Sequence, residues 1–330
     1  MPGEERCLAQ RDHHPALRRR EVEQSRVDPI TLELIKNALQ SIVDEMALTV
    51  VRTAHSGVIK DVMDFSTGFC TASGEMIAQG LTLPLHLGAI PDAMTAVLRK
   101  YGTNVAPGDI IIMNDPFDGG MHLPDIFMFK PLFYRGELIG FPAVVCHHTD
   151  VGGRVAGSNA SDSTEIYQEG LRIPPLKLYE AGVPNETLFA LIEKNVRVPV
   201  KVLGDLRAQL AACHIAEREY LRLVERYGVQ ELNRYLEELL NYTERLARAE
   251  IAAMPDGEYS FTDYIDNDGI DPDPILLQVR VTVHGDTMTV DFSGTSPQVK
   301  GAINSTFSFT KSAVYLSVRC IMDAHIPNNA

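Results

Sequence analysis

Two short segments of the sequence, residues 114–125 and 146–153, gather side chains that could do chemistry. They contain three of the ten histidines, His122, His147 and His148, together with four aspartates. Imidazole and carboxylate together form a ligand mixture that suits a divalent metal such as manganese, iron or zinc. Three protein ligands would leave coordination positions open for water or substrate, as metal-assisted chemistry requires. The two segments therefore predict an open metal site.

The spacing of these residues restricts which of them reach one metal. Residues 138–146 have the apolar composition of a buried strand, and if that strand continues, His147 and His148 point to opposite faces. His122 and Asp125 flank a Leu-Pro pair, where proline stiffens a turn that lets the two side chains converge. We therefore expect His122, Asp125 and His147 as the metal ligands. A site with His148 in place of His147 is the competing assignment.

The other polar residues of the second segment, His148 and Asp150, are expected to act beside the metal. Metal ligands need partners that fix their tautomer and orientation, and a neighbouring acid or base moves the proton in hydrolysis. The alternative is that these histidines cap strands and form local hydrogen bonds, which is one of the many roles of a single imidazole. Their clustering with aspartates favours the metal site.

Other polar features carry weaker signals. His55 and His86 each occur singly beside apolar residues. The acidic residues within 263–273 lack the glutamate that a calcium loop requires, so we expect these residues to form a solvated turn. The sequence contains no G-x-x-x-x-G-K-[ST] loop, no G-x-G-x-x-G after a strand and no G-x-S-x-G elbow. If nucleotide is used, we expect another chain to bind it.

The hydrophobic pattern predicts the elements that must position these segments. Asp28 is a candidate helix N-cap with Pro29 at the first helical position, and apolar residues follow at helical spacing as far as Val50. From residue 61 to about residue 141 the pattern changes to short apolar runs broken by glycine and proline, which indicate buried strands.

Two further elements follow the candidate site. The helical period returns between residues 199 and 254 with Gly228 as a stop, which indicates a helical hairpin. Strict alternation on both sides of a His-Gly-Asp turn within residues 279–292 indicates a β-hairpin.

These elements predict an α+β fold with mixed β-sheets, long helices and a helical hairpin. Residues 1–27 are rich in charge and lack an apolar period, so we expect a disordered tail. Residues 28–254 would form the catalytic domain that holds the metal site. Residues 255–330 would begin a β-rich second domain, which we expect to be incomplete because the sequence stops without a closing cap.

The composition limits which classes of protein this chain can belong to. The 330 residues are 45% hydrophobic, which is enough for a sizeable core, and 44 acidic against 30 basic residues give a net charge of −14. Such a surface repels nucleic acid and anionic lipid, and no stretch approaches the roughly 20 apolar residues of a membrane-spanning helix. The start lacks the apolar core of a secretory signal, and the five scattered cysteines include no C-x-x-C pair. We expect a cytoplasmic protein with reduced, mostly buried thiols and no nucleic-acid or membrane partner.

At these residues the sequence resembles the hydantoinase B/oxoprolinase family, which includes N-methylhydantoinase B subunits, the C-terminal part of 5-oxoprolinase and the large subunits of acetone and acetophenone carboxylases. The resemblance covers essentially everything after the tail. It is carried by the motifs DPITLE (28–33), DFS (64–66), PLHLG (84–88), NDP (114–116), HLPD (122–125), HHTDVGG (147–153), QEGLRIPP (168–175), GDLRAQ (204–209), DFSGTS (291–296) and GAIN (301–304).

For the carboxylase branch, the resemblance implies a divalent metal, typically manganese, held by residues that match His122, Asp125 and His147. The ligand chemistry admits zinc or iron as alternatives. The resemblance also implies a partner subunit with an actin-like ATPase that phosphorylates the substrate. For a hydantoin or 5-oxoproline ring, phosphorylation makes the amide carbon electrophilic and a metal-bound water attacks it, while His148 or Asp150 moves the proton. The expected function is therefore ATP-dependent opening of a cyclic amide.

Two alternatives stay open. In the carboxylase branch, the same metal would stabilise an enolate formed from a phosphorylated ketone, and the ligand set does not separate this reaction from hydrolysis. Members of the family usually continue well beyond the residue matching Ala330, so an inactive, truncated scaffold is the second alternative.

Overall fold

The computed structural model describes residues 27–80, 82–102 and 104–329, so the tail expected at residues 1–27 lies outside the described residues apart from Val27. The helices are α1 (Pro29–Thr53), α2 (Gly57–Lys60), α3 (Ala89–Tyr101), α4 (Glu186–Asn195), α5 (Pro199–Tyr227), α6 (Val229–Ala252) and α7 (Phe307–Arg319), with short 3-10 helices η1 (Pro84–Gly88), η2 (Pro116–Asp118) and η3 (Ile166–Gln168). The strands are β1 (Phe65–Cys70), β2 (Met76–Gln79), β3 (Ile110–Met113), β4 (Asp125–Phe129), β5 (Leu132–Tyr134), β6 (Glu137–His147), β7 (Leu176–Glu180), β8 (Val183–Pro184), β9 (Gly257–Ile265), β10 (Ile275–His284) and β11 (Thr287–Asp291). The predicted α+β class is confirmed.

The larger of two sheets has the strand order β2-β1-β6-β4-β3-β7-β8, and β5 pairs with β6 beside this path. Its described strand pairs are all antiparallel, whereas the sequence led us to expect sheets of mixed direction. The difference has a simple cause. An apolar run identifies a buried strand but carries no information on the direction of its neighbour.

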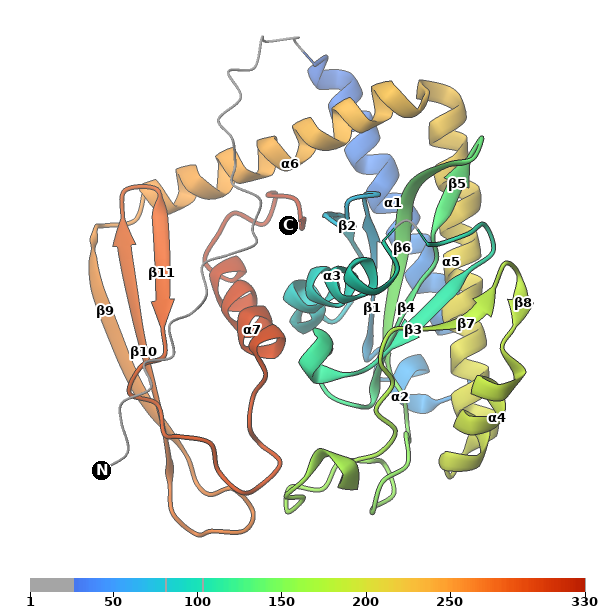
Figure 1. The fold of residues 1–330 in the computed structure, drawn as a ribbon. Coiled ribbons are helices and arrows are strands. Elements are labelled where there is room, and N and C mark those ends of the chain that lie inside the picture. Colours follow the sequence, from blue (N-terminus) through green and yellow to red (C-terminus); the bar gives the residue numbers. More distant parts are fainter. Residues whose placement is uncertain (1–26, 81, 103, 330) are drawn as a thin grey trace.

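Helices cover both faces of this sheet (Figure 1). α1 and α5 pack against one face, and α3 packs against the other, so each face has its own hydrophobic core. Strand side chains alternate between these two cores, as the pleat requires. In β4, for example, Ile126 and Met128 belong to the α1–α5 core, whereas Phe127 and Phe129 belong to the α3 core.

The long helices begin and end where the sequence predicts. The Asp28 carboxylate accepts a hydrogen bond from the Thr31 N–H at 2.9 Å and thereby caps α1, with Pro29 at its first position. Gly228, at φ 77°, separates α5 from α6. A left-handed φ of this kind favours glycine, which explains why the helical hairpin turns at this residue.

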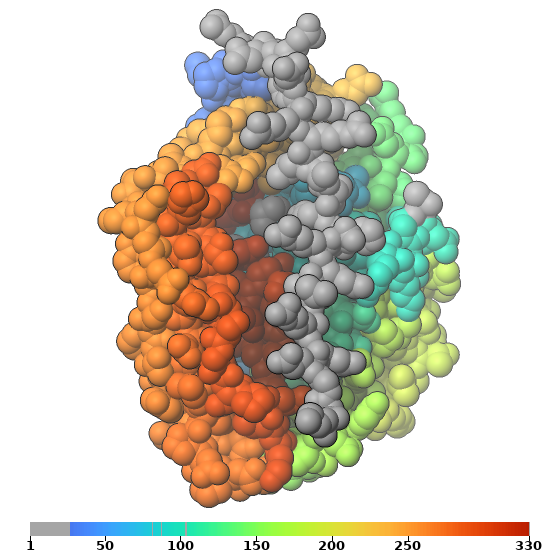
Figure 2. All heavy atoms as spheres, turned by 60° about the vertical axis from the view of Figure 1, so that its left-hand side comes forward, coloured from blue at the N-terminus to red at the C-terminus, as the bar shows by residue number. Residues whose placement is uncertain are grey.

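The chain after α6 forms a second sheet and then returns to the first. β9, β10 and β11 form an antiparallel three-stranded sheet, which includes the predicted hairpin. α7 then packs on η1 and α3, where the Gly88 N–H donates to Ser312 Oγ at 3.1 Å and Ser308 Oγ donates to the Gly120 carbonyl (Figure 1). The domain boundary after residue 254 stays a prediction, since β9, β10 and β11 form a separate sheet whereas α7 packs on η1 and α3. Figure 2 shows the orange and red residues of this part together on one side of the molecule.

Burial of the thiols agrees with a reduced core. Cys70, Cys146 and Cys213 are buried and free, and burial raises the pKa of Cys70 and of Cys213 to about 12. Thiols with such values carry little thiolate and react slowly. Among the helices of the described chain, none combines the length and the apolar character that crossing a membrane requires.

Candidate metal centre

Neighbouring strands place two of the three expected ligands opposite each other. β4 begins at Asp125 and β6 ends at His147, and the two residues are paired in register. Asp125 lies two residues before Phe127 on β4, and His147 lies two residues after Val145 on β6. Phe127 and Val145 both belong to the α3 core, and residues two apart on a strand point to the same face. The two side chains therefore leave the sheet on the same face.

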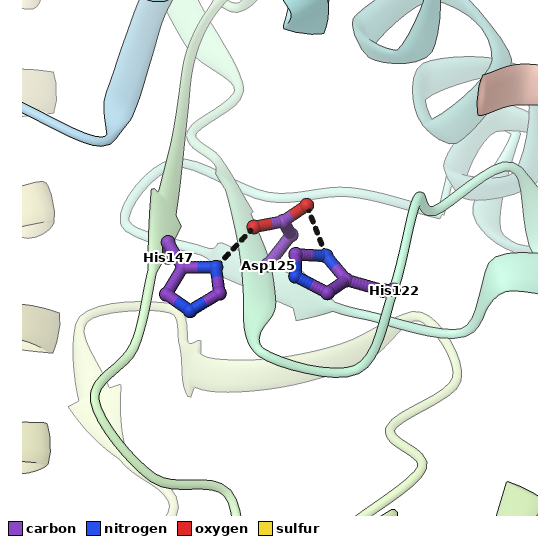
Figure 3. Close-up of side chains that lie close together, drawn as sticks. All are labelled: His122, Asp125 and His147. Carbon is purple, nitrogen blue, oxygen red and sulfur yellow. Dashed lines mark hydrogen bonds and ion pairs between the residues drawn. The ribbon is translucent and has the colours of Figure 1, made fainter. Parts of the chain in front are cut away.

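His122 lies in the turn that leads into β4. The Asp125 N–H donates to the His122 carbonyl at 3.0 Å, which closes the turn around the Leu-Pro pair. His122 Nδ1 lies 2.6 Å from Asp125 Oδ2. Because an ionised carboxylate can only accept, Nδ1 is the donor of this hydrogen bond. Figure 3 shows the imidazole directed at the carboxylate.

His147 completes the cluster. Its Nδ1 lies 3.4 Å from Asp125 Oδ1 and 3.9 Å from Asp64 Oδ2. The centroids of the His122 and His147 rings are 4.8 Å apart. One potential ligand atom from each of His122, Asp125 and His147 lies within 4.8 Å of the other two. The structure thus brings together the three residues that we expected as ligands.

The charges of this cluster stabilise one another. Burial alone would raise the pKa of Asp125, but the charge and hydrogen bond of His122, together with His147, hold the pKa of this carboxyl below its usual range. Burial likewise opposes a charged imidazole at His122, yet the charge and hydrogen bond of Asp125 raise the pKa of that ring. Without a metal, His122 and Asp125 form a hydrogen-bonded ion pair in which the carboxylate is buried and the imidazole is partly exposed.

One buried oxygen of the cluster, Asp125 Oδ1, has no hydrogen-bond donor among the described residues. Asp125 is 1% exposed, and the 3.4 Å approach of His147 Nδ1 to this oxygen is an electrostatic contact only. A buried carboxylate oxygen without a partner is costly unless a cation compensates it. An oxygen between two imidazoles is a donor set that suits manganese, iron or zinc. The residues present therefore fit a divalent metal.

The structure separates His148 and Asp150 from this cluster. The His148 ring is 0% exposed, and its Nε2 lies 3.1 Å from Gln209 Oε1 on α5, on the opposite side of the sheet from Asp125. Asp150 accepts hydrogen bonds from the Arg197 guanidinium at 2.9 Å and from the Gly152 N–H at 3.0 Å. Neither side chain lines the cavity that the cluster faces. We therefore propose structural roles for both in place of the expected proton transfer, and we do not retain the assignment with His148 as a ligand.

Asn114 links the turn that carries His122 to the loop of residues 171–173 by hydrogen bonds. Its Nδ2 donates to the Leu123 carbonyl at 2.6 Å and to the Leu171 carbonyl at 2.9 Å. Its Oδ1 accepts from the Ile173 N–H at 2.6 Å. Asn114 is fully buried, and its bonds to Leu123 and Ile173 lie away from water. The turn before β4 is thereby held in place.

The cluster faces a cavity of about 350 Å³. Apolar side chains, among them Leu83, Leu85 and Phe309, form part of its wall. The loop of residues 302–306, which precedes α7, also lines it, because α7 packs on η1. A small ligand with an apolar body and one polar end would fit such a cavity.

Three contributors to this cavity were not selected from the sequence. Asp64 precedes β1 and is one of 44 acidic residues, and His86 on η1 occurs singly, so neither had a spacing that suggested a site. The loop 302–306 was assigned to a separate domain. The motifs DFS, PLHLG and GAIN contain Asp64, His86 and residues 302–304 of the loop, and only the resemblance carried that signal.

An α+β sheet that carries a histidine–carboxylate cluster on neighbouring strand ends, open to a cavity, is typical of a metal-dependent enzyme. The family model described as hydantoinase B/oxoprolinase matches residues 28–330. The chain belongs to this family, so the predicted resemblance is confirmed.

Individual relatives agree with this membership. The beta subunit of the caprolactamase of Pseudomonas jessenii is 38% identical over 301 residues, which cover 91% of this chain and 51% of that protein. The putative B subunit of the D-/L-hydantoinase of Pseudomonas sp. (strain NS671) is 34% identical over 308 residues, with 90% and 52% covered. The chain thus spans about half the length of the curated relatives that it matches.

Two solved structures share the fold. The crystal structure of the ATP-dependent caprolactamase from Pseudomonas jessenii has a TM-score of 0.84 and 37% identity, covering 92% of this chain and 52% of that one. The nucleotide-free structure of acetone carboxylase has a TM-score of 0.85, with 92% of this chain and 42% of that one covered. At 20% identity, the second likeness is one of fold alone.

Proposed function

We propose that this chain is the metal-site subunit of an ATP-dependent amidohydrolase that opens a cyclic amide together with a partner ATPase. The observation that carries the proposal is the cluster of His122, Asp125 and His147, which faces a cavity of small-molecule size. Within this cluster the buried Asp125 Oδ1 lacks a hydrogen-bond donor among the described residues. The names of the two relatives, a caprolactamase and a putative hydantoinase, indicate the substrate class.

The chain's own residues have three tasks in this reaction. His122, Asp125 and His147 would hold the metal, which when bound polarises a carbonyl and acidifies water. The apolar wall that includes Leu83, Leu85 and Phe309 would receive the ring of the substrate and exclude bulk water. The buried bonds of Asn114 keep the turn of the first ligand in position.

A second protein chain is part of the proposal. The sequence contains no phosphate-binding loop of the G-x-x-x-x-G-K-[ST] type, and the names of the two relatives describe beta and B subunits of larger enzymes. The caprolactamase structure is titled ATP-dependent. We therefore propose a hydantoinase A/oxoprolinase-type ATPase as the partner. The expected cytoplasmic location stays a prediction.

Ketone carboxylation, the alternative expected from the sequence, has weaker support. It rests on the fold of acetone carboxylase at 20% identity, whereas these two relatives above 30% identity carry hydrolase names. Manganese is the metal that we propose, on the family resemblance, and the ligand chemistry admits zinc and iron as well.

The test combines metal analysis with a ring-opening assay. The purified chain should contain about one divalent metal, and with the partner ATPase and ATP it should open at least one of caprolactam, hydantoin and 5-oxoproline. Asp125→Asn should lose both the metal and the activity. His214→Ala is the matched control, since that histidine is 54% exposed on α5 and, within the described part of the chain, pairs only with Glu217.

Each failure has a distinct meaning. A metal-loaded chain that opens no cyclic amide with its partner overturns the hydrolase proposal, and incorporation of labelled bicarbonate into a ketone would then favour carboxylation. A well-folded chain that binds none of manganese, zinc and iron overturns the metal site and favours the inactive scaffold.

A further inference from the structure

One further imidazole at the cavity, that of His86, has no role in the proposed function described above. His86 lies on η1, is 2% exposed, and lines the same cavity as His122, Asp125 and His147. It is not one of the three clustered ligands. What this imidazole can do at the cavity depends on which ring nitrogen carries the proton, because a protonated nitrogen donates a hydrogen bond and an unprotonated one accepts.

Hydrogen bonding fixes the tautomer of this ring. Ser66 Oγ lies 2.7 Å from the Leu83 carbonyl and 2.8 Å from His86 Nδ1. A carbonyl oxygen can only accept, so the single hydroxyl proton of Ser66 goes to Leu83. Ser66 Oγ must then accept from His86, and Nδ1 carries the imidazole proton. In a neutral ring, Nε2 is left with a free lone pair.

The surroundings keep the ring neutral. Burial lowers the pKa of His86, the carboxylates of Asp125 and Asp64 partly offset this, and the positive charges of His122 and His147 lower it further. A bound divalent metal would add positive charge and act in the same direction. A neutral imidazole with Nδ1 protonated is a proton acceptor at Nε2.

We propose that His86 is a catalytic residue whose Nε2 accepts the proton of the water that attacks the amide carbon, an inference that rests on the proposed function. As the water oxygen bonds to the carbonyl carbon, one water O–H bond breaks and an Nε2–H bond forms. The ring C–N bond then breaks, and the same proton passes from Nε2 to the leaving nitrogen. The second water proton stays at first on the new carboxyl group and passes to the amine as the two groups ionise. The products are a carboxylate and an ammonium group, one water is added, and His86 returns to its neutral form.

Ser66 has a separate, positioning role in this scheme. It lies on β1, where it is paired with Val145 of β6, and it is fully buried. The sheet therefore holds its hydroxyl between the Leu83 carbonyl and the imidazole. Without that hydroxyl the ring could adopt the other tautomer and present an N–H instead of a lone pair.

Activity measurements with metal analysis test the base. In the complex with the partner ATPase, His86→Gln and His86→Ala should keep their metal while kcat for ring opening falls by about 10²- to 10⁴-fold. Added imidazole should restore part of the activity of His86→Ala, because the truncated side chain leaves room for it, but not of His86→Gln. Ser66→Ala should lose less activity, and His214→Ala should lose none.

Three results would overturn the role of His86. They are a kcat of His86→Gln within threefold of wild type, a loss of activity that parallels loss of metal, and a lack of imidazole rescue in a folded, metal-loaded His86→Ala. A structural role alone would not be rescued by imidazole in solution.

An independent measurement separates this inference from the proposed function. With ¹⁵N-labelled histidine, NMR of the wild-type chain should show His86 with a protonated Nδ1 and an unprotonated Nε2, assigned by comparison with His86→Gln. A protonated Nε2 overturns the inference even if cyclic amides are opened. If the tautomer is as expected but the wild-type complex opens no ring, the proposed function fails, and the role of His86 as its base fails with it.

Discussion

His147 and His148 leave the end of β6 on opposite faces of the larger sheet. His147 Nδ1 approaches Asp125 Oδ1 at 3.4 Å on the side of α3, whereas His148 Nε2 lies 3.1 Å from Gln209 Oε1 on α5. Strand alternation alone produces this separation. Two adjacent histidines of one motif thus have different surroundings, one beside a cavity and one in the core.

The first prediction contrasts these two histidines. His147→Ala should lose the metal with little change in the free energy of unfolding of the metal-free chain, since this side chain is at the cavity and partly exposed. His148→Ala should keep the metal but lower that free energy by about 1–3 kcal/mol, because buried Gln209 Oε1 would lose its partner. Elemental analysis and urea denaturation measure the two effects. Metal loss in His148→Ala at full stability would reverse the assignment.

The second prediction concerns the pH dependence of the metal-free chain. The pKa of His122 is raised in the folded state, so its contribution to stability is fully present below the ordinary imidazole pKa of about 6.5 and is lost as pH rises through the raised value. Urea midpoints of the chelator-treated chain should therefore fall as pH increases above about 6.5. Asp125→Asn should flatten that dependence, because it removes the charge that raises the pKa. An unchanged slope in this variant would contradict the ion pair.

Local rules were sufficient to predict that the three candidate ligands lie close together. The turn between His122 and Asp125 and the alternation at His147 depend on neighbours within a few residues, and so does the cap of α1 by Asp28. Such short-range geometry follows from residue type and spacing. For that reason the structure groups the same three residues that the sequence favoured.

Contacts across the chain were not predictable in this way. The bond between the Gly88 N–H and Ser312 Oγ joins residues 224 positions apart, and it helps bring the loop before α7 to the cavity. No periodicity connects such positions. His86 and Ser66 are likewise 20 residues apart in different elements, so a singly occurring histidine gave no sign of its partner. Strand direction was undetermined for the same reason.

The third prediction concerns Asn114, whose hydrogen bonds hold the turn that carries His122. Asn114→Ala would remove a buried group with three hydrogen bonds, to Leu123, Leu171 and Ile173, and should lower the free energy of unfolding by about 3 kcal/mol or more. Metal affinity should fall as well, since the turn loses its support. Asn195→Ala is the control, because Asn195 is exposed and, among the residues that the structure describes, its side chain bonds only to Leu191 of its own helix. Equal effects of the two variants would show that the buried network does not hold the turn.

The fourth prediction compares two glycines of the loop after β6. Gly153 and Gly157 have similar φ values of 78° and 82°, so alanine at either position is strained by about 1–2 kcal/mol. A Cβ on Gly153 would also lie 2.5 Å from the Gln168 carbonyl oxygen, whereas nothing lies within 4 Å of a Cβ on Gly157.

The clash at Gly153 should therefore displace the segment that begins at Gln168 and continues to Ile173, one of the partners of Asn114. We expect Gly153→Ala to lose more stability than Gly157→Ala and, in addition, to bind metal more weakly. Urea denaturation of the metal-free variants and metal titration measure the two differences. If both variants lose the same stability and keep wild-type metal affinity, the close approach at Gly153 does not support the metal centre, and its glycine is needed for the backbone conformation alone.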